Sequence, residues 1–131
     1  MSAASDYLEN ALLDHVLGNS SFTQPANRYV ALFTASPNDD NSGTGSELSG
    51  GSYARQSVTF GAAASGTTSN TNELTFSSLN GVSATAISHL GIYDASTGGN
   101  LLFHGSLTTP KTVADGEDAV IRVGQITLTL N

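Results

Sequence analysis

The feature that most limits the possible folds is a series of short apolar segments separated by turns rich in glycine, serine, threonine and asparagine. Near the C-terminus Ile126, Leu128 and Leu130 alternate strictly with threonines. A period of two is typical of a β-strand, in which successive side chains point to opposite faces. The segments predicted to be strands are residues 28–34, 53–60, 74–76, 87–93, 100–106 and 119–130.

The connections between these segments also carry information. Residues 94–99 (DASTGG) have the composition of a hairpin loop between two neighbouring strands. Residues 61–72 are a small-residue linker, and residues 109–111 (TPK) mark a bend. Within residues 119–130 the apolar side chains change parity at Gly124, which predicts a β-bulge.

Only residues 6–17 show the period of a helix. Leu8, Leu12 and Val16 lie along one stripe, and Asp6 is the predicted N-cap. A helix this short is only marginally stable alone in water, so it needs a surface to pack on. That surface is either the protein's own sheet or a neighbouring subunit, and the stripe is therefore a candidate interface.

One helix followed by six or seven short strands predicts a mainly β protein. We expect a small antiparallel β-sandwich or a barrel-like domain with one N-terminal α-helix. With 131 residues, the chain has the length of a single domain, residues 1–131, with one core.

A long polar segment, residues 35–52, precedes the strand at residues 53–60. It is either a solvated, mobile loop or a functional loop that a partner orders. Strand alternation places Tyr53 and Arg55 on one face of the strand. We predict that these two residues anchor the base of the loop, near a contact between subunits.

The charge of the chain excludes several classes of partner. The net charge is −7, and only four residues are lysine or arginine. Binding to nucleic acid or to an anionic membrane surface requires clustered cations, so neither is expected. No apolar run approaches the length of a membrane span, and no signal peptide is visible, so we expect synthesis in the cytoplasm.

The sequence contains no recognisable catalytic motif. It lacks the G-x-S-x-G turn of hydrolases and the lysine-containing phosphate loop. His89 and His104 could face each other across the predicted hairpin, but a third metal ligand is missing. Two groups of oxygen-bearing side chains are read as solvated turns rather than Ca²⁺ sites: Asn38, Asp39 and Asp40 with Glu47, and Asp115, Glu117 and Asp118. We therefore predict no catalytic residue, no cofactor and no metal.

Four stretches of the sequence together resemble a family of small proteins of tailed bacteriophages. They are DYLENALLDHVLG, RYVALFTASP, SGGSYARQSVTF and HLGIYDASTGGNLLFHGSLTTPKTVADGEDAVIRVGQITLTL. Members of this family are commonly labelled tail fibre or minor structural proteins. The resemblance covers nearly the whole chain and implies a non-enzymatic component of the virion.

The resemblance implies a small accessory subunit on the exterior of the particle, acting through protein–protein contacts. The subunit would be associated with the tail or a fibre, or would decorate the capsid as a cement protein. Its partners would be tail proteins or the major capsid protein, together with further copies of itself in a homo-oligomer. The alternative is a carbohydrate-binding module for host recognition, although tryptophan, a common platform for sugars, is absent.

Overall fold

The computed structural model describes residues 3–79 and 86–130. Its elements are β1 (Ala3–Ala4), α1 (Asp6–Val16), β2 (Tyr29–Phe33), the 3-10 helix η1 (Thr44–Ser46), β3 (Gln56–Ser57), β4 (Thr67–Ser69), β5 (Leu74–Phe76), β6 (Ile87–Tyr93), β7 (Leu101–Lys111), β8 (Ala119–Ile121) and β9 (Thr127–Thr129). α1 is too short and too polar to cross a membrane, and it is the only α-helix in the described part of the chain.

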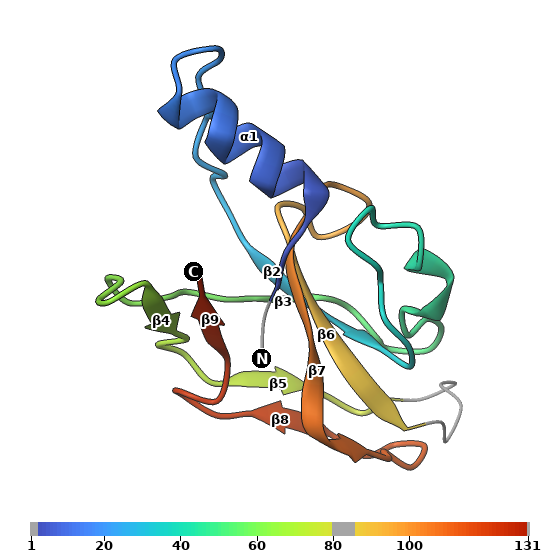
Figure 1. The fold of residues 1–131 in the computed structure, drawn as a ribbon. Helices are drawn as coiled ribbons and strands as arrows, with labels where there is room; N and C mark the ends of the chain where they lie inside the picture. The colour runs from blue at the N-terminus through green and yellow to red at the C-terminus, as the bar shows by residue number, and fades with distance from the viewer. Residues whose placement is uncertain (1–2, 80–85, 131) are drawn as a thin grey trace.

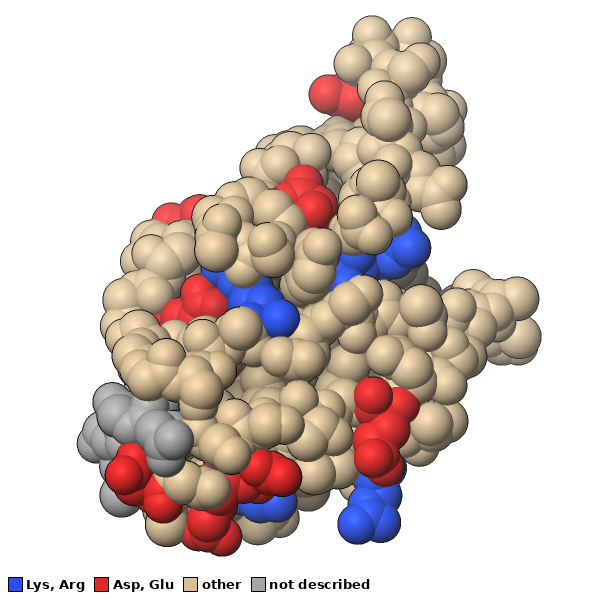
Figure 2. Space-filling model, turned by 180° about the vertical axis from the view of Figure 1, so that it is seen from behind, with Lys and Arg blue, Asp and Glu red and all other residues tan. Residues whose placement is uncertain are grey.

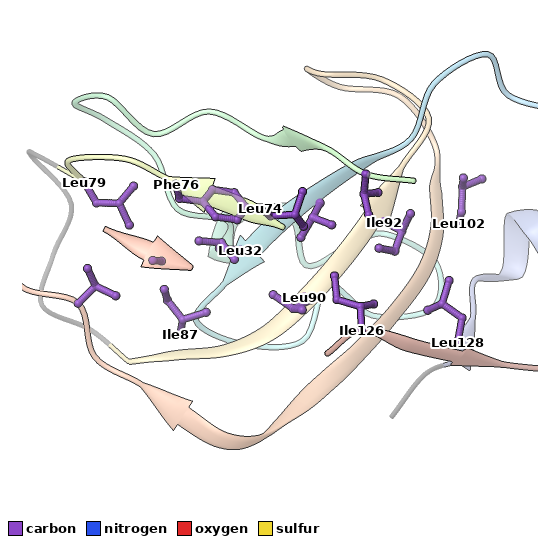
Figure 3. Packing of buried hydrophobic residues seen from close by; sticks show 14 of the residues in the cluster. Leu32, Leu74, Phe76, Leu79, Ile87, Leu90, Ile92, Leu102, Ile126 and Leu128 are labelled. Atoms are coloured by element: carbon purple, nitrogen blue, oxygen red, sulfur yellow. The ribbon is translucent and has the colours of Figure 1, made fainter. Parts of the chain in front are cut away.

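The strands form three antiparallel sheets (Figure 1). The large sheet has the order β1-β7-β6-β2-β3, and the pairs β4-β9 and β5-β8 form two small sheets. The main core lies between the large sheet and the small ones, with Leu32, Leu90 and Ile92 on one side and Phe76 and Ile126 on the other (Figure 3). The prediction of a mainly β fold with one N-terminal helix is confirmed, and the sheets do not close into a barrel.

The centre of the large sheet is buried on both faces. In β2, Val30 and Leu32 belong to the main core, whereas Phe33 packs against Tyr93 in a second cluster. Gly91 of β6 lies beside this second cluster, where a Cβ atom would approach the rings of Phe33 and Tyr93 to 3.0 Å. Glycine is needed here because of this close approach.

β7 is longer than the predicted strand at residues 100–106, and the predicted bend at residues 109–111 is wrong. The hairpin with β6 continues until Ile87 pairs with Lys111. β1 covers the other edge of β7 only at Phe103 and His104. Beyond these residues no strand of the described part of the chain pairs with that edge, a position at which Pro110, which has no N–H group, is tolerated.

The predicted strand at residues 53–60 is largely wrong. Only Gln56–Ser57 pairs with β2 as a strand, and Phe60 forms a single bridge to Asn70. The N–H group of Thr59 donates to the side-chain oxygen of Asn72 at 3.0 Å instead of to a neighbouring strand. A side chain therefore replaces the ladder at this position.

The predicted strand at residues 119–130 is in fact two strands in different sheets. Between β8 and β9 the chain makes a turn in which the Gln125 N–H donates to the Arg122 carbonyl at 3.1 Å. Gly124, with a φ angle of 79°, lies in this turn, so the predicted bulge is wrong. β9 pairs with β4, a strand inside the stretch predicted to be a linker.

One buried amide connects the turn to the small sheets. Asn70, only 2% exposed, donates from its side chain to the carbonyls of Asn72 and Arg122, at 2.9 and 3.0 Å. Its side-chain oxygen accepts the N–H of Ile126 at 2.9 Å. All of these partners are backbone groups, so Asn70 substitutes for missing strand pairing.

α1 begins at Asp6, as predicted, but its N-cap is one residue earlier than predicted. Ser5, not Asp6, is the N-cap, and its hydroxyl accepts the N–H of Leu8 at 3.2 Å. The same hydroxyl donates to the carbonyl of Leu101 in β7. This double role requires a buried hydroxyl group, and it fixes the start of α1 to the large sheet.

Candidate functional site

The predicted interface stripe on α1 is divided between the core and the solvent. Leu8 is 5% exposed and belongs to the main core, and Leu12 is half-buried against that core. Val16, at the other end of the helix, is 74% exposed. Figure 1 shows why: α1 starts at the large sheet and projects beyond the body of the protein. The protein's own sheet therefore covers only the first half of the stripe.

The exposed end of α1 carries an apolar surface that we call the helix tip, formed by Leu13, Val16 and Leu17. These side chains are 58%, 74% and 71% exposed. The sequence prediction included Val16 but not the two leucines. Large apolar side chains grouped on the surface of a protein, in contact with water, indicate an interaction site.

The segment that follows α1 supports the helix from one side. The ring of Phe22 meets the ring of Tyr7 edge-on, with 6.5 Å between the ring centroids. The N–H of Phe22 donates to Nδ1 of His15 at 3.0 Å. These contacts leave the helix tip uncovered while connecting the helix to the returning chain.

A second apolar surface lies where the β4-β9 pair meets the edge of the large sheet. It is a groove with a volume of about 270 Å³, and we call it the apolar groove. Its walls are almost entirely apolar and include Phe60, Ala63, Ile92, Phe103, Leu128 and Leu130.

Arg28 also lines the apolar groove. Its guanidinium donates to the carbonyl of Pro25 at 3.0 Å, and it forms no ion pair with any residue that the structure describes. The groove is thus an apolar surface with one cation beside it. Figure 2 shows blue and red side chains scattered over an otherwise neutral surface on the face drawn there.

The two other candidate interface residues, Tyr53 and Arg55, meet at Glu47. Arg55 binds both carboxylate oxygens of Glu47, through Nε and Nη2, each at 2.8 Å. The Tyr53 hydroxyl donates to Glu47 at 2.9 Å and accepts the N–H of Leu32 at 3.1 Å. Because Glu47 lies in the long polar segment, these bonds fasten the end of that segment to β2.

Arg55 is enclosed by further groups. Its Nη1 donates to the carbonyls of Ala95 and Gly98 at 3.0 and 2.8 Å, and its guanidinium lies 3.8 Å from the centre of the Tyr93 ring. The side chain is only 6% exposed. Burial favours the neutral guanidine, but the hydrogen bonds and charge of Glu47 outweigh this effect and raise the pKa of Arg55. The contacts of Arg55 with Glu47 and with the Tyr93 ring are both within the chain, and a role of Arg55 between subunits stays a prediction.

The long polar segment is held by hydrogen bonds of the chain itself. Leu48 donates its N–H to the Leu32 carbonyl at 2.9 Å, and Thr34 donates to Ser46 at 2.9 Å. Nearer its start, Asp39 pairs with His104 of β7. Neither predicted alternative describes this segment, because its defined contacts are made by its own chain.

The residues considered for metal binding are not brought together. The hairpin register places His89 opposite Ser106 and His104 opposite Gly91, so the two histidines do not face each other. Within residues 3–79 and 86–130, no three histidine, aspartate or glutamate side chains could hold one metal ion. In the acidic turn, Glu117 accepts a backbone N–H group at 2.9 Å, which is a structural role.

Taken together, the described residues form a small β-rich protein with two exposed apolar surfaces. A protein-family model described as Podophage GP4 fiber I protein gp80 matches residues 3–129. The chain therefore belongs to this family of phage fibre proteins and is a structural protein of the virion. This confirms the resemblance to tail fibre or minor structural proteins. No curated protein matches the chain.

Proposed function

We propose that this chain is a small accessory subunit on the exterior of the phage particle, associated with the tail fibres. It acts through protein–protein contacts and not through catalysis. The observation that carries the proposal is the helix tip, where Leu13, Val16 and Leu17 are exposed on a projecting helix. The membership in a fibre family supports the tail rather than the capsid as the location.

The energetics of the helix tip support a contact role. Complete burial of one valine or leucine side chain contributes about 1.5–3 kcal/mol. Three such side chains on one surface can therefore supply a large part of the free energy of a specific contact, which commonly depends on a few residues. The helix contributes little to its own core beyond Leu8 and Leu12, so its projecting half is available for a partner.

Carbohydrate binding has less support from the structure. Of the four tyrosines, Tyr93 is completely buried, and the Tyr53 hydroxyl is already used by Glu47 and Leu32. Tyr7 meets the ring of Phe22. A sugar platform requires an open aromatic face; these three rings already have partners in the fold, and the fourth tyrosine, Tyr29, is half-buried.

The location is tested by gold-labelled antibody on intact phage particles, viewed by electron microscopy. We expect label on the tail or its fibres and a copy number of tens per particle by quantitative mass spectrometry. Label spread over the capsid, with hundreds of copies, would show that the chain decorates the capsid. A chain absent from purified particles would exclude a structural role in the virion.

A further inference from the structure

We infer that the helix tip of one copy docks into the apolar groove of a second copy. This inference rests on the proposed contact role of the helix tip and names its partner. Both halves of the contact are present in the same chain: an exposed apolar projection and an apolar groove.

The distribution of exposed apolar side chains points to these two surfaces. Six large apolar residues in the described part of the chain are exposed: Tyr7, Leu13, Val16, Leu17, Val123 and Leu130. Four of them belong to α1 and its C-cap, and Leu130 belongs to the wall of the groove. Leaving both surfaces in water is unfavourable, and one contact would cover both.

The size of the groove suits side chains better than a free ligand. Its volume of about 270 Å³ is below the range of roughly 300–1,000 Å³ that is typical of small-molecule pockets. Small-molecule pockets also place several polar groups to orient the ligand, whereas the exposed walls of this groove are almost wholly apolar. Aliphatic side chains such as Val16 and Leu17 need no polar partner.

The charges at the two surfaces are opposite. Asp14 is exposed on the same end of α1, at the border of the helix tip beside Leu17 in helical order. Arg28 lines the groove and has no carboxylate partner among the described residues. In a chain with net charge −7 and only four lysines and arginines, an unpaired cation beside an apolar groove favours an acidic partner. Asp14, at the border of the helix tip, supplies such an acidic group.

The tip cannot enter the groove of its own chain without breaking the start of the helix. The Ser5 hydroxyl bonds to β7, and Leu8 is part of the core, so the direction of α1 is fixed. Figure 1 shows α1 leaving the sheets, with its C-terminal end projecting from the body that contains β4 and β9. The occupant is therefore the tip of another copy.

Such a contact joins two different surfaces, so it is heterologous. A heterologous contact produces a closed ring or an open chain of subunits, unless two copies exchange tips reciprocally. In each case the same two side-chain groups meet, which allows one direct test.

The test uses cysteine pairs, because the chain contains no cysteine of its own. Chains carrying V16C are mixed with chains carrying A63C, a substitution in the groove wall, and treated with a short bis-maleimide. The matched control is A114C, since Ala114 is exposed in the turn between β7 and β8. We expect the V16C and A63C chains to cross-link at least tenfold more than the V16C and A114C chains. Equal yields would overturn the inference.

A second test measures self-association by sedimentation. Val16→Asp places a charge in the contact, and Val123→Asp makes the same change at a site 61% exposed outside both surfaces. We expect Val16→Asp to raise the dissociation constant about tenfold or more, because burying one valine contributes that much, and Val123→Asp to leave it unchanged. Both variants should fold, because both positions are exposed, and circular dichroism checks this.

The failure of this inference and the failure of the proposed function give different results. A wild-type chain that stays monomeric at high concentration overturns the contact between copies. If that chain is nevertheless found on the fibre by antibody labelling, the proposed function stands. If the A63C groove cross-links on particles only to another virion protein, the groove has a different occupant and the inference is wrong.

Discussion

The buried pair of Arg55 and Glu47 provides the strongest test of how the long polar segment is fastened. Replacing Arg55 with methionine keeps the aliphatic part of the side chain and removes the charge. The Glu47 carboxylate then loses two hydrogen bonds, and the carbonyls of Ala95 and Gly98 each lose one. Glu47 keeps the hydrogen bond from the Tyr53 hydroxyl, but its charge is left without a cation.

The expected cost follows from the burial of the pair. Breaking a buried ion pair by removing one partner costs about 3–5 kcal/mol. Here the Glu47 side chain keeps 17% of its exposure, so water partly solvates the remaining carboxylate. We therefore expect Arg55→Met to lower the free energy of unfolding by about 3 kcal/mol. That is a large part of the 5–15 kcal/mol typical of a domain.

The assay is urea unfolding followed by circular dichroism. Arg122→Met is the matched control, because Arg122 is exposed, and we expect a change within about 0.5 kcal/mol. Glu47→Gln and the double variant complete a mutant cycle, in which the two residues should be strongly coupled. If Arg55→Met costs less than about 1 kcal/mol, Arg55 does not anchor the loop.

Three further predictions concern the core and the tyrosines. Gly91→Ala should destabilise the protein by about 1–3 kcal/mol through overpacking, whereas Gly45→Ala, with open space around it, should be neutral in thermal unfolding; equal effects would contradict the packing described. Asn70→Ala should cost about 1–3 kcal/mol because it leaves buried backbone groups unsatisfied, and an unchanged melting temperature would show that they find other partners. Burial raises the pKa of Tyr53, and raises that of Tyr93 to about 12, from an ordinary value of about 10. Because the folded state keeps these protons longer, stability should fall as the pH rises from about 10 to 12, with two late tyrosines in an absorbance titration; four tyrosines ionising together near pH 10 would disprove this.

The parts of the fold that sequence reasoning recovered are those with a strong local pattern. The helical stripe and the apolar runs at residues 28–34 and 87–93 carry their own period, and the structure has α1, β2 and β6 there. The polar strand β4 was missed because the hydroxyls of Thr67 and Ser69 bond to threonine hydroxyls of β9 across the pair, a contact that no local apolar pattern reveals. The turn at Gly124 was misread because a glycine at a change of parity fits both a bulge and a change of sheet.

The candidate site was also predictable only where a local sequence pattern determines it. The sequence put Tyr53 and Arg55 on one face, but it could not identify Glu47 as the group that binds both of them, because that contact depends on how the long segment returns to β2. It also could not separate buried Leu8 from exposed Val16, since both obey the same period. Only the direction in which α1 leaves the sheet distinguishes them. The apolar groove was not predictable, since residues from five separated segments form it.

The central claim is that the projecting end of α1 holds this chain in the phage particle. The most direct measurement is the copy number of the chain in purified particles of phage that carry Val16→Asp, compared with phage that carry Val123→Asp. The account predicts that the Val16→Asp chain is produced and folded but largely missing from the particles, whereas the Val123→Asp chain is incorporated at the wild-type level. Wild-type incorporation of the Val16→Asp chain would contradict the account.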